Sequence, residues 1–104
     1  MKILITGASG LLGGWFAEFF SNKGHDIILL TRYAANNNSL KNYGSIENIN
    51  WNDQNKLNDI CKDLDLIIHA AGPSVQECAD NSHESVSSYE KLTQNLLKSI
   101  EINS

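Results

Sequence analysis

Apolar residues gather in short runs along the chain, and the polar segments between these runs are long enough to contain helices. The runs Lys2–Thr6 and Asp26–Thr31 are apolar at nearly every internal position. A strand that is apolar on both faces is typical of the interior of a parallel sheet. We expect two further strands, a short one at Ile49–Trp51 and an apolar one at Leu64–Ala71. The second of these is broken by Gly72-Pro73-Ser74.

Between the predicted strands, apolar residues recur at the spacing of helices. The first helix has an apolar face at helical spacing and ends near Gly24, a residue suited to a left-handed cap. That face consists of Leu12, Trp15, Phe16, Phe19 and Phe20. A short helix is expected around Leu40 to Tyr43. Another has Leu57, Ile60, Cys61 and Leu64 on one face and Asp53 as its cap. The last helix runs from about Glu84, with Val86, Tyr89, Leu92, Leu96 and Ile100 on its apolar face.

This alternation of strands and helices predicts an α/β fold. We expect a Rossmann-type parallel sheet flanked by helices and incomplete, with about four strands. The 104 residues are read as a single truncated domain covering 1–104.

Composition narrows the classes of partner. The net charge of −4 and the lack of a basic patch argue against nucleic-acid binding. No apolar run is long enough to cross a membrane, and no signal peptide begins the chain, so a cytoplasmic location is expected. Cys61 and Cys78 match no metal or redox spacing and are read as free thiols, and no metal site is predicted.

A glycine-rich segment lies between the first strand and the first helix. Gly7, Gly10 and Gly13 have the spacing G-x-x-G-x-x-G, a variant of the dinucleotide-binding fingerprint. The first allows a sharp turn, the second lets a phosphate approach the backbone, and the third lets the helix pack close to the strand. Amide groups at the helix start face the pyrophosphate. The candidate pyrophosphate residues are therefore Gly7, Ser9, Gly10, Leu11, Leu12 and Gly13. A structural turn without a ligand is the competing interpretation.

Three segments together resemble the short-chain dehydrogenase/reductases of the extended type, the NAD-dependent epimerase/dehydratase family. Residues 6–13 are similar to its T-G-x-x-G-x-x-G loop. Residues 65–72 are similar to its D-V-V-I-H-x-A-A strand, and Thr93, Asn95, Leu96 and Leu97 to its G-T-x-N-L-L helix. The resemblance covers nearly the whole chain. It implies the dinucleotide-binding part of a sugar-nucleotide epimerase, dehydratase or reductase.

The resemblance also assigns the cofactor contacts beyond the glycine loop. Thr31 stands where NAD-preferring members have an acidic residue, and Arg32 follows it, which favours NADP over NAD. Arg32 could instead be solvated or stack on adenine. Asn50 and Trp51 align with the adenine contact, although Trp51 could equally pack in a core. Ala70, Ala71 and Gly72 would line the cofactor, while His69 is read as a structural residue.

Catalytic residues of the family have no counterpart in the sequence. The family uses a Tyr-x-x-x-Lys pair for proton transfer, whereas Tyr89 is followed by lysine two positions later and lies in the wrong helix. No catalytic residue is therefore assigned, and the chain alone is expected to be inactive. A non-catalytic NAD(P)-binding sensor or regulatory module and a ligand-free structural domain remain alternatives. Because the fourth strand is expected at a bare sheet edge, self-association through that edge is predicted.

Overall fold

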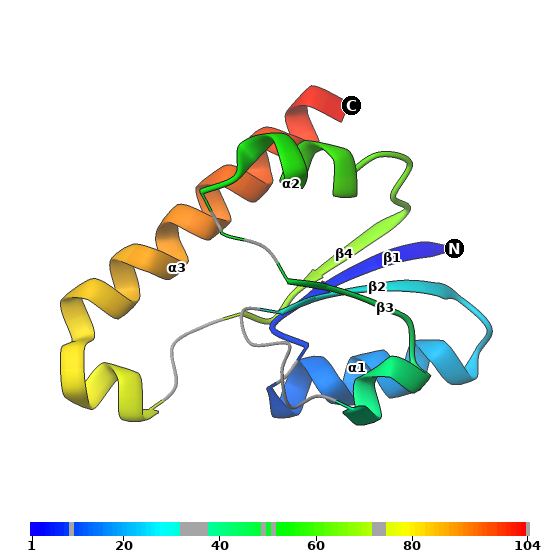
Figure 1. Cartoon of the computed structure of the whole chain (residues 1–104), viewed down its shortest axis with the longest axis horizontal. Coiled ribbons are helices and arrows are strands. Elements are labelled where there is room, and N and C mark those ends of the chain that lie inside the picture. Colours follow the sequence, from blue (N-terminus) through cyan, green and yellow to red (C-terminus); the bar gives the residue numbers. More distant parts are fainter. Residues whose placement is uncertain (9, 32–37, 49, 51, 72–74, 104) are drawn as a thin grey trace. The chain divides into compact units, whose positions relative to one another are not determined.

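The computed structural model describes residues 1–8, 10–31, 38–48, 50, 52–71 and 75–103. Its elements along the chain are β1 (Lys2–Thr6), α1 (Leu11–Asn22), β2 (Asp26–Thr31), the 3-10 helix η1 (Asn38–Asn42), β3 (Ser45–Asn48), α2 (Gln54–Ile60), β4 (Leu66–His69) and α3 (Val75–Asn103). They form two compact units, one of residues 1–49 and 63–71, the other of residues 50–62 and 72–104. The first holds the sheet with α1 and η1, and the second holds α2 and α3 (Figure 1).

The sheet has the strand order β3-β2-β1-β4, and all described strands are parallel. The expected α/β sheet of four strands is therefore confirmed. Strand β1 is central, with Ile5 paired to Leu29 on one side and to Ile68 on the other. Ile5 and Leu29 are fully buried, and each such side chain removed from water stabilises the fold by about 1.5 to 3 kcal/mol.

Helix α1 packs on the sheet through a face that only partly matches the predicted one, since Phe16 and Phe20 pack against the core as expected. Its fully buried residues are Gly13 and Ala17, while Trp15 and Phe19 are 56% and 41% exposed. The physical reason is size, because the two smallest side chains allow the closest approach to the strands. Trp15 and Phe19 instead stack on each other with ring centroids 5.5 Å apart. The predicted core role of these two aromatics and of Leu12, which is 59% exposed, is wrong.

The third strand lies earlier than predicted, at Ser45–Asn48 in place of Ile49–Trp51. It is the sheet edge beside β2, and its residues are half-buried or exposed. A half-exposed edge strand carries polar residues, so its sequence lacks the apolar run that marks the interior strands. Residues 49 and 51 are outside the described part. Asn50 lies in a turn, and its carbonyl oxygen accepts the Asp53 N–H.

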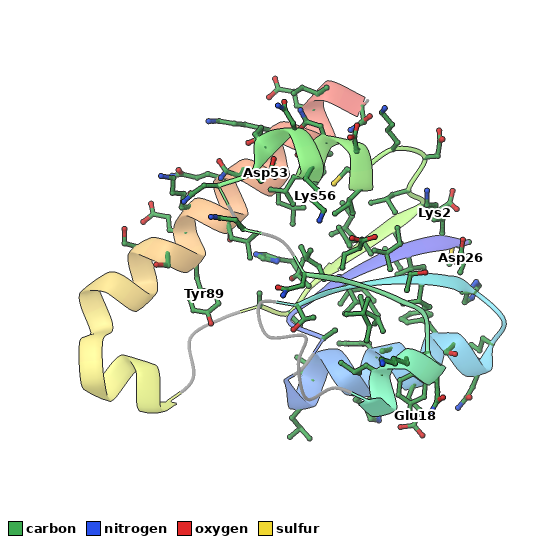
Figure 2. The ribbon with its side chains drawn as sticks, in the orientation of Figure 1. Lys2, Glu18, Asp26, Asp53, Lys56 and Tyr89 are labelled. Carbon is green, nitrogen blue, oxygen red and sulfur yellow. The ribbon has the colours of Figure 1, made fainter. Side chains whose placement is uncertain are left out.

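The helices of the second unit differ from expectation in length. Helix α2 ends at Ile60, four residues before Leu64, and is followed by Asp63 in the left-handed region at φ 59°. Helix α3 begins at Val75, well before Glu84. The predicted cap is confirmed, since Asp53 Oδ1 accepts the N–H of Lys56 at 3.2 Å. Figure 2 labels both residues at the start of α2.

Helix α2 lies against the C-terminal half of α3 (Figure 1). Leu57 on α2, Cys61 at its C-cap, and Leu92 and Leu96 on α3 are buried. In the described ranges, no helix combines the length and the apolar character that a bilayer crossing requires.

Candidate functional site

The first glycine of the loop makes the turn from β1 toward α1. Gly7 has φ +66°, a backbone conformation that side chains disfavour, and its carbonyl oxygen accepts the Gly10 N–H at 3.0 Å. A Cβ atom at Gly7 would lie 2.7 Å from the carbonyl carbon of Ala70 and from the amide nitrogen of Ala71. The turn therefore touches the backbone at the carboxyl end of β4. The structure thus brings together three of the predicted cofactor residues.

The third glycine lets α1 begin directly against this turn. A Cβ atom at Gly13 would overlap the Gly7 carbonyl oxygen and come 3.0 Å from the Cα of Ala8. Gly13 is itself buried. The close helix-to-strand contact predicted from the glycine spacing is therefore present, and it is made by backbone atoms.

The start of α1 has a glycine as its N-cap residue, so the N-cap itself offers no side chain to the first-turn amides. Gly10 is the N-cap residue in extended conformation (φ −81°, ψ 169°), and its carbonyl oxygen accepts the Gly14 N–H at 2.9 Å. The N–H groups of the first turn, at Leu11, Leu12 and Gly13, precede any intrahelical acceptor. Leu11 is 94% exposed, and the first turn contains no acidic residue. Amides and helix dipole together make this end suited to an anion.

Thr6 joins β1 to the end of β4, a role that the sequence interpretation missed. Its buried hydroxyl oxygen accepts the Ala71 N–H at 3.2 Å and lies 2.5 Å from His69 Nδ1. This arrangement positions the residue 71 amide beside the glycine turn. A lone threonine between an apolar strand and the first glycine was the available signal, because a hydroxyl at a buried strand end needs a partner.

His69 lies at the same place. The residue as a whole is exposed to solvent, yet the Nδ1 edge of its ring lies against Thr6. Partial burial of the ring lowers the pKa of the imidazole below its ordinary value of 6.5. A neutral ring can accept the Thr6 hydroxyl proton at Nδ1, since the Thr6 oxygen already accepts the Ala71 N–H. The contact with Thr6 agrees with the structural role predicted for His69.

The remaining predicted cofactor residues fall into three groups. Thr31 ends β2 and is buried, in register with Asn48 of β3. Because the strands are parallel, their carboxyl ends meet at one edge, which places Thr31, the glycine turn and Ala70 along it. Asn50 belongs to the second unit, where its Oδ1 accepts the Asn52 N–H at 2.9 Å. Ser9, Arg32, Trp51 and Gly72 are outside the described residues.

Other reactive side chains in the described part of the chain do not gather into a site of their own. Among the residues that the structure describes, no three His, Cys, Asp or Glu side chains are grouped as metal ligands would be. Cys61 is a free thiol, and its burial raises its pKa. Tyr89 lies on α3, where its carbonyl oxygen accepts the Thr93 hydroxyl at 3.0 Å.

Solved structures share this arrangement of strands and helices. A UDP-glucose 4-epimerase from Bifidobacterium longum in complex with NAD+ and UDP superposes with a TM-score of 0.84 at 20% identity, over 99% of this chain and 34% of its own. An L-threonine dehydrogenase from Clostridium difficile superposes with a TM-score of 0.81 at 27% identity, over 94% of this chain and 32% of its own. A UDP-N-acetylglucosamine 4-epimerase from Bacillus cereus has a TM-score of 0.74 at 26% identity, over 99% of this chain and 34% of its own.

The chain thus spans about a third of the length of these structures. A search of curated proteins returned no significant match. The model of the NAD dependent epimerase/dehydratase family, in contrast, matches residues 3–104, nearly the whole chain, and includes the glycine turn and the end of β4. The chain therefore belongs to the NAD dependent epimerase/dehydratase family.

Proposed function

We propose that the chain binds a nicotinamide dinucleotide, with its pyrophosphate at the start of α1. The observation that carries this proposal is the start of α1, where the N-cap is the glycine Gly10 and the adjoining turn has no room for a Cβ atom at Gly7 or Gly13. A purely structural turn needs the tight backbone contacts, but it does not need an exposed helix start with a glycine N-cap and no acidic residue in the first turn. Membership of the family supports the same function.

Each part of the chain would have a separate task toward the cofactor. The amides of Leu11 and Leu12 would hold the pyrophosphate, with Gly10 giving access and Ser9 beside it. Thr31 and Arg32 would meet the adenosine ribose, Asn50 and Trp51 the adenine, and Ala70, Ala71 and Gly72 the far side of the cofactor. When bound, the nicotinamide supplies hydride transfer.

The reaction class follows from the family. We propose that the chain acts as the dinucleotide-binding part of a sugar-nucleotide epimerase, dehydratase or reductase. The sequence contains no Tyr-x-x-x-Lys pair, so we expect no turnover from these 104 residues alone. A non-catalytic sensor is the second candidate, and the same missing pair favours it. Turnover of a nucleotide sugar on addition of a separate polypeptide carrying such a pair would decide for the enzyme.

Cofactor binding is tested by titrating the chain with NADPH and NADH and following tryptophan fluorescence. Trp15 lies one turn beyond Leu11 on α1 and is partly exposed, so it is a suitable reporter. Saturable binding of either nucleotide supports the proposal. A chain that binds neither at millimolar concentration would instead be a ligand-free structural domain.

The preference between the two cofactors rests on Arg32. A guanidinium at the end of β2 can pair with a 2′-phosphate, whereas the carboxylate typical of NAD-preferring members would repel it. We expect Arg32→Ala to weaken NADPH binding by about tenfold, the effect of losing roughly 1.4 kcal/mol of charge-assisted hydrogen bonding, and to leave NADH binding unchanged. The solved relatives include complexes with NAD. Equal loss for both nucleotides would show that Arg32 stacks on adenine and would contradict the NADP preference.

Self-association is proposed through β4, which is one edge of the described sheet. Its outer edge offers backbone groups for pairing, and Leu66 at its start is 37% exposed. We expect light scattering to give a mass above that of one chain as concentration rises. Ile67→Pro, which removes a backbone N–H from the strand, should reduce that mass toward the monomer. A monomer at millimolar concentration would contradict the proposal.

A further inference from the structure

Helix α1, in the first compact unit, carries exposed apolar side chains four residues apart along its length. Leu11, Trp15 and Phe19 are 94%, 56% and 41% exposed, and the C-cap residue Lys23 follows at the same spacing. Residues four apart are neighbours on a helix surface, so these side chains form one continuous stripe. Leu12 adds a second exposed leucine beside it. This set of Leu11, Leu12, Trp15, Phe19 and Lys23 is called the α1 stripe below.

The two aromatic rings of the α1 stripe are held in place by rings that pack on the sheet. Trp15 meets Phe16 edge to face with ring centroids 5.2 Å apart, and Phe19 meets Phe20 in the same way, also at 5.2 Å. Phe16 and Phe20 pack against the hydrophobic core. Exposed rings fixed in this way lose little conformational freedom when a partner covers them, and such aromatic residues carry much of the binding energy of interfaces.

The apolar area of the α1 stripe is large for a small domain. At these exposures its leucines and aromatic rings present on the order of 500 Å², and the largest apolar patch of an ordinary monomer is about 300 to 600 Å² and often functional. Two copies that cover one another would bury about 1,000 Å² in total, the lower limit for a specific interface. The area therefore matches a weak, reversible dimer.

The order of residues makes the α1 stripe complementary to itself. Its midpoint along the helix is Ala17, so an antiparallel pair with twofold symmetry places Trp15 opposite the partner's Phe19 and Lys23 opposite the partner's Leu11. Lys23 Nζ lies 5.0 Å from the centroid of the Phe19 ring, and the methylene groups of a lysine can cover apolar surface. The two Lys23 charges would be about 18 Å apart along the helices, beyond the screening length of about 8 Å.

Glu18, the acidic residue of α1, is exposed beside the α1 stripe (Figure 2). The twofold axis of an antiparallel pair turns the same flank of both helices to the same side, so the two Glu18 carboxylates approach each other near the midpoint. Like charges at an exposed site weaken an interface modestly, and salt screens them. Salt should therefore strengthen this dimer, whereas it weakens an interface that depends on ion pairs.

We propose that the α1 stripe is a docking surface for the α1 stripe of a second copy of this chain, in an antiparallel pair. This surface is separate from the outer edge of β4. Pairing through β4 would use backbone groups of that strand and would not involve α1. Burial of Trp15 is therefore the specific sign of pairing through the α1 stripe.

The test combines sedimentation equilibrium with tryptophan emission in the Trp51→Phe variant, in which Trp15 is the remaining tryptophan. As concentration rises, we expect the mass to increase from one chain to two and the Trp15 emission to shift to shorter wavelength. Adding Phe19→Ser should weaken the dimer at least tenfold, the effect of losing an aromatic anchor. Leu97→Ser is the matched control, because Leu97 is an exposed apolar residue of α3 outside the stripe, and it should leave the dimer unchanged.

Glu18→Gln keeps the test independent of any folding defect in Phe19→Ser. It should tighten the dimer about two- to fivefold at low salt, and high salt should remove the difference. A mass that rises without a shift of the Trp15 emission, and equally in Phe19→Ser, overturns the proposal in favour of pairing through β4. A chain that stays monomeric at millimolar concentration also overturns it, and short-wavelength Trp15 emission from that monomer would show that the α1 stripe is covered within one chain.

Discussion

Replacing Gly13 with alanine is expected to destabilise the chain by about 3 kcal/mol or more, the upper range for overpacking a site that cannot relax. The added methyl group would overlap the Gly7 carbonyl oxygen and press on Ala8 Cα. Both are backbone atoms of the turn, so no side-chain rotation can relieve the contact. The loss is a large share of the stability of a small domain. We expect the melting temperature to fall by roughly 12 to 24 °C for a chain of this size.

Gly14, the next residue, supplies a control in which alanine should change the stability in the opposite direction. A Cβ atom at Gly14 would lie 3.4 Å from the Ala8 carbonyl oxygen, an ordinary contact, and the residue is inside α1. Alanine there should raise the stability by about 0.5 to 1 kcal/mol, because it restricts the unfolded chain and favours the helix. Denaturant unfolding of the Gly13→Ala and Gly14→Ala variants measures both changes in the free energy of unfolding. Equal stabilities would show that α1 does not sit against the turn in solution.

Replacing Gly10 with alanine is expected to weaken cofactor binding on the order of thirtyfold, equivalent to ~2 kcal/mol of steric cost at the pyrophosphate. Unlike Gly13, this position can take a methyl group in the free protein if the neighbouring backbone shifts by a few tenths of an ångström. The nearest atom to its Cβ would be the Gly7 carbonyl oxygen at 3.3 Å. The methyl group would stand at the N-cap of α1, in the path by which a phosphate reaches the first-turn amides. The variant should therefore fold and lose affinity for NADPH and for pyrophosphate alike.

Gly24→Ala provides the matched control for this experiment. Gly24 follows α1 at φ +82° with open space around its Cα, at the opposite end of the helix. Alanine there should cost about 1 kcal/mol of backbone strain and leave affinity unchanged. Isothermal titration of both variants with NADPH separates the two effects. A Gly10→Ala chain with wild-type affinity would mean that the pyrophosphate lies elsewhere.

Gly13 and Gly10 thus separate two roles within one motif. The same spacing G-x-x-G-x-x-G is needed by a tight structural turn and by a phosphate site, and the sequence cannot distinguish the two. The structure assigns the strict steric requirement to Gly7 and Gly13, whereas a Cβ atom at Gly10 would make only one tight contact, with the Gly7 carbonyl oxygen at 3.3 Å. Stability should report on the first two and affinity on the third.

The interior strands and the glycine turn were predictable from the sequence because their signals are local. Strands β1 and β2 begin and end at the predicted residues, since strands buried on both faces must be apolar throughout. The Asp53 cap and the left-handed Gly24 also follow from short-range backbone geometry. The edge strand β3 was misplaced for the converse reason, because a half-exposed strand tolerates Ser45 and Glu47.

What the sequence by itself determined is the order of elements, the four-stranded α/β class and the place of the glycine turn, all of which depend on neighbouring residues. Tertiary structure alone decided which face of α1 meets the sheet, because closest approach favours Gly13 and Ala17 over the larger Trp15 and Phe19. It also decided the partners of Thr6 and Ser99. Their hydroxyl groups bond with residues 63 to 65 and 41 to 45 positions away, and local patterns do not encode contacts over such separations.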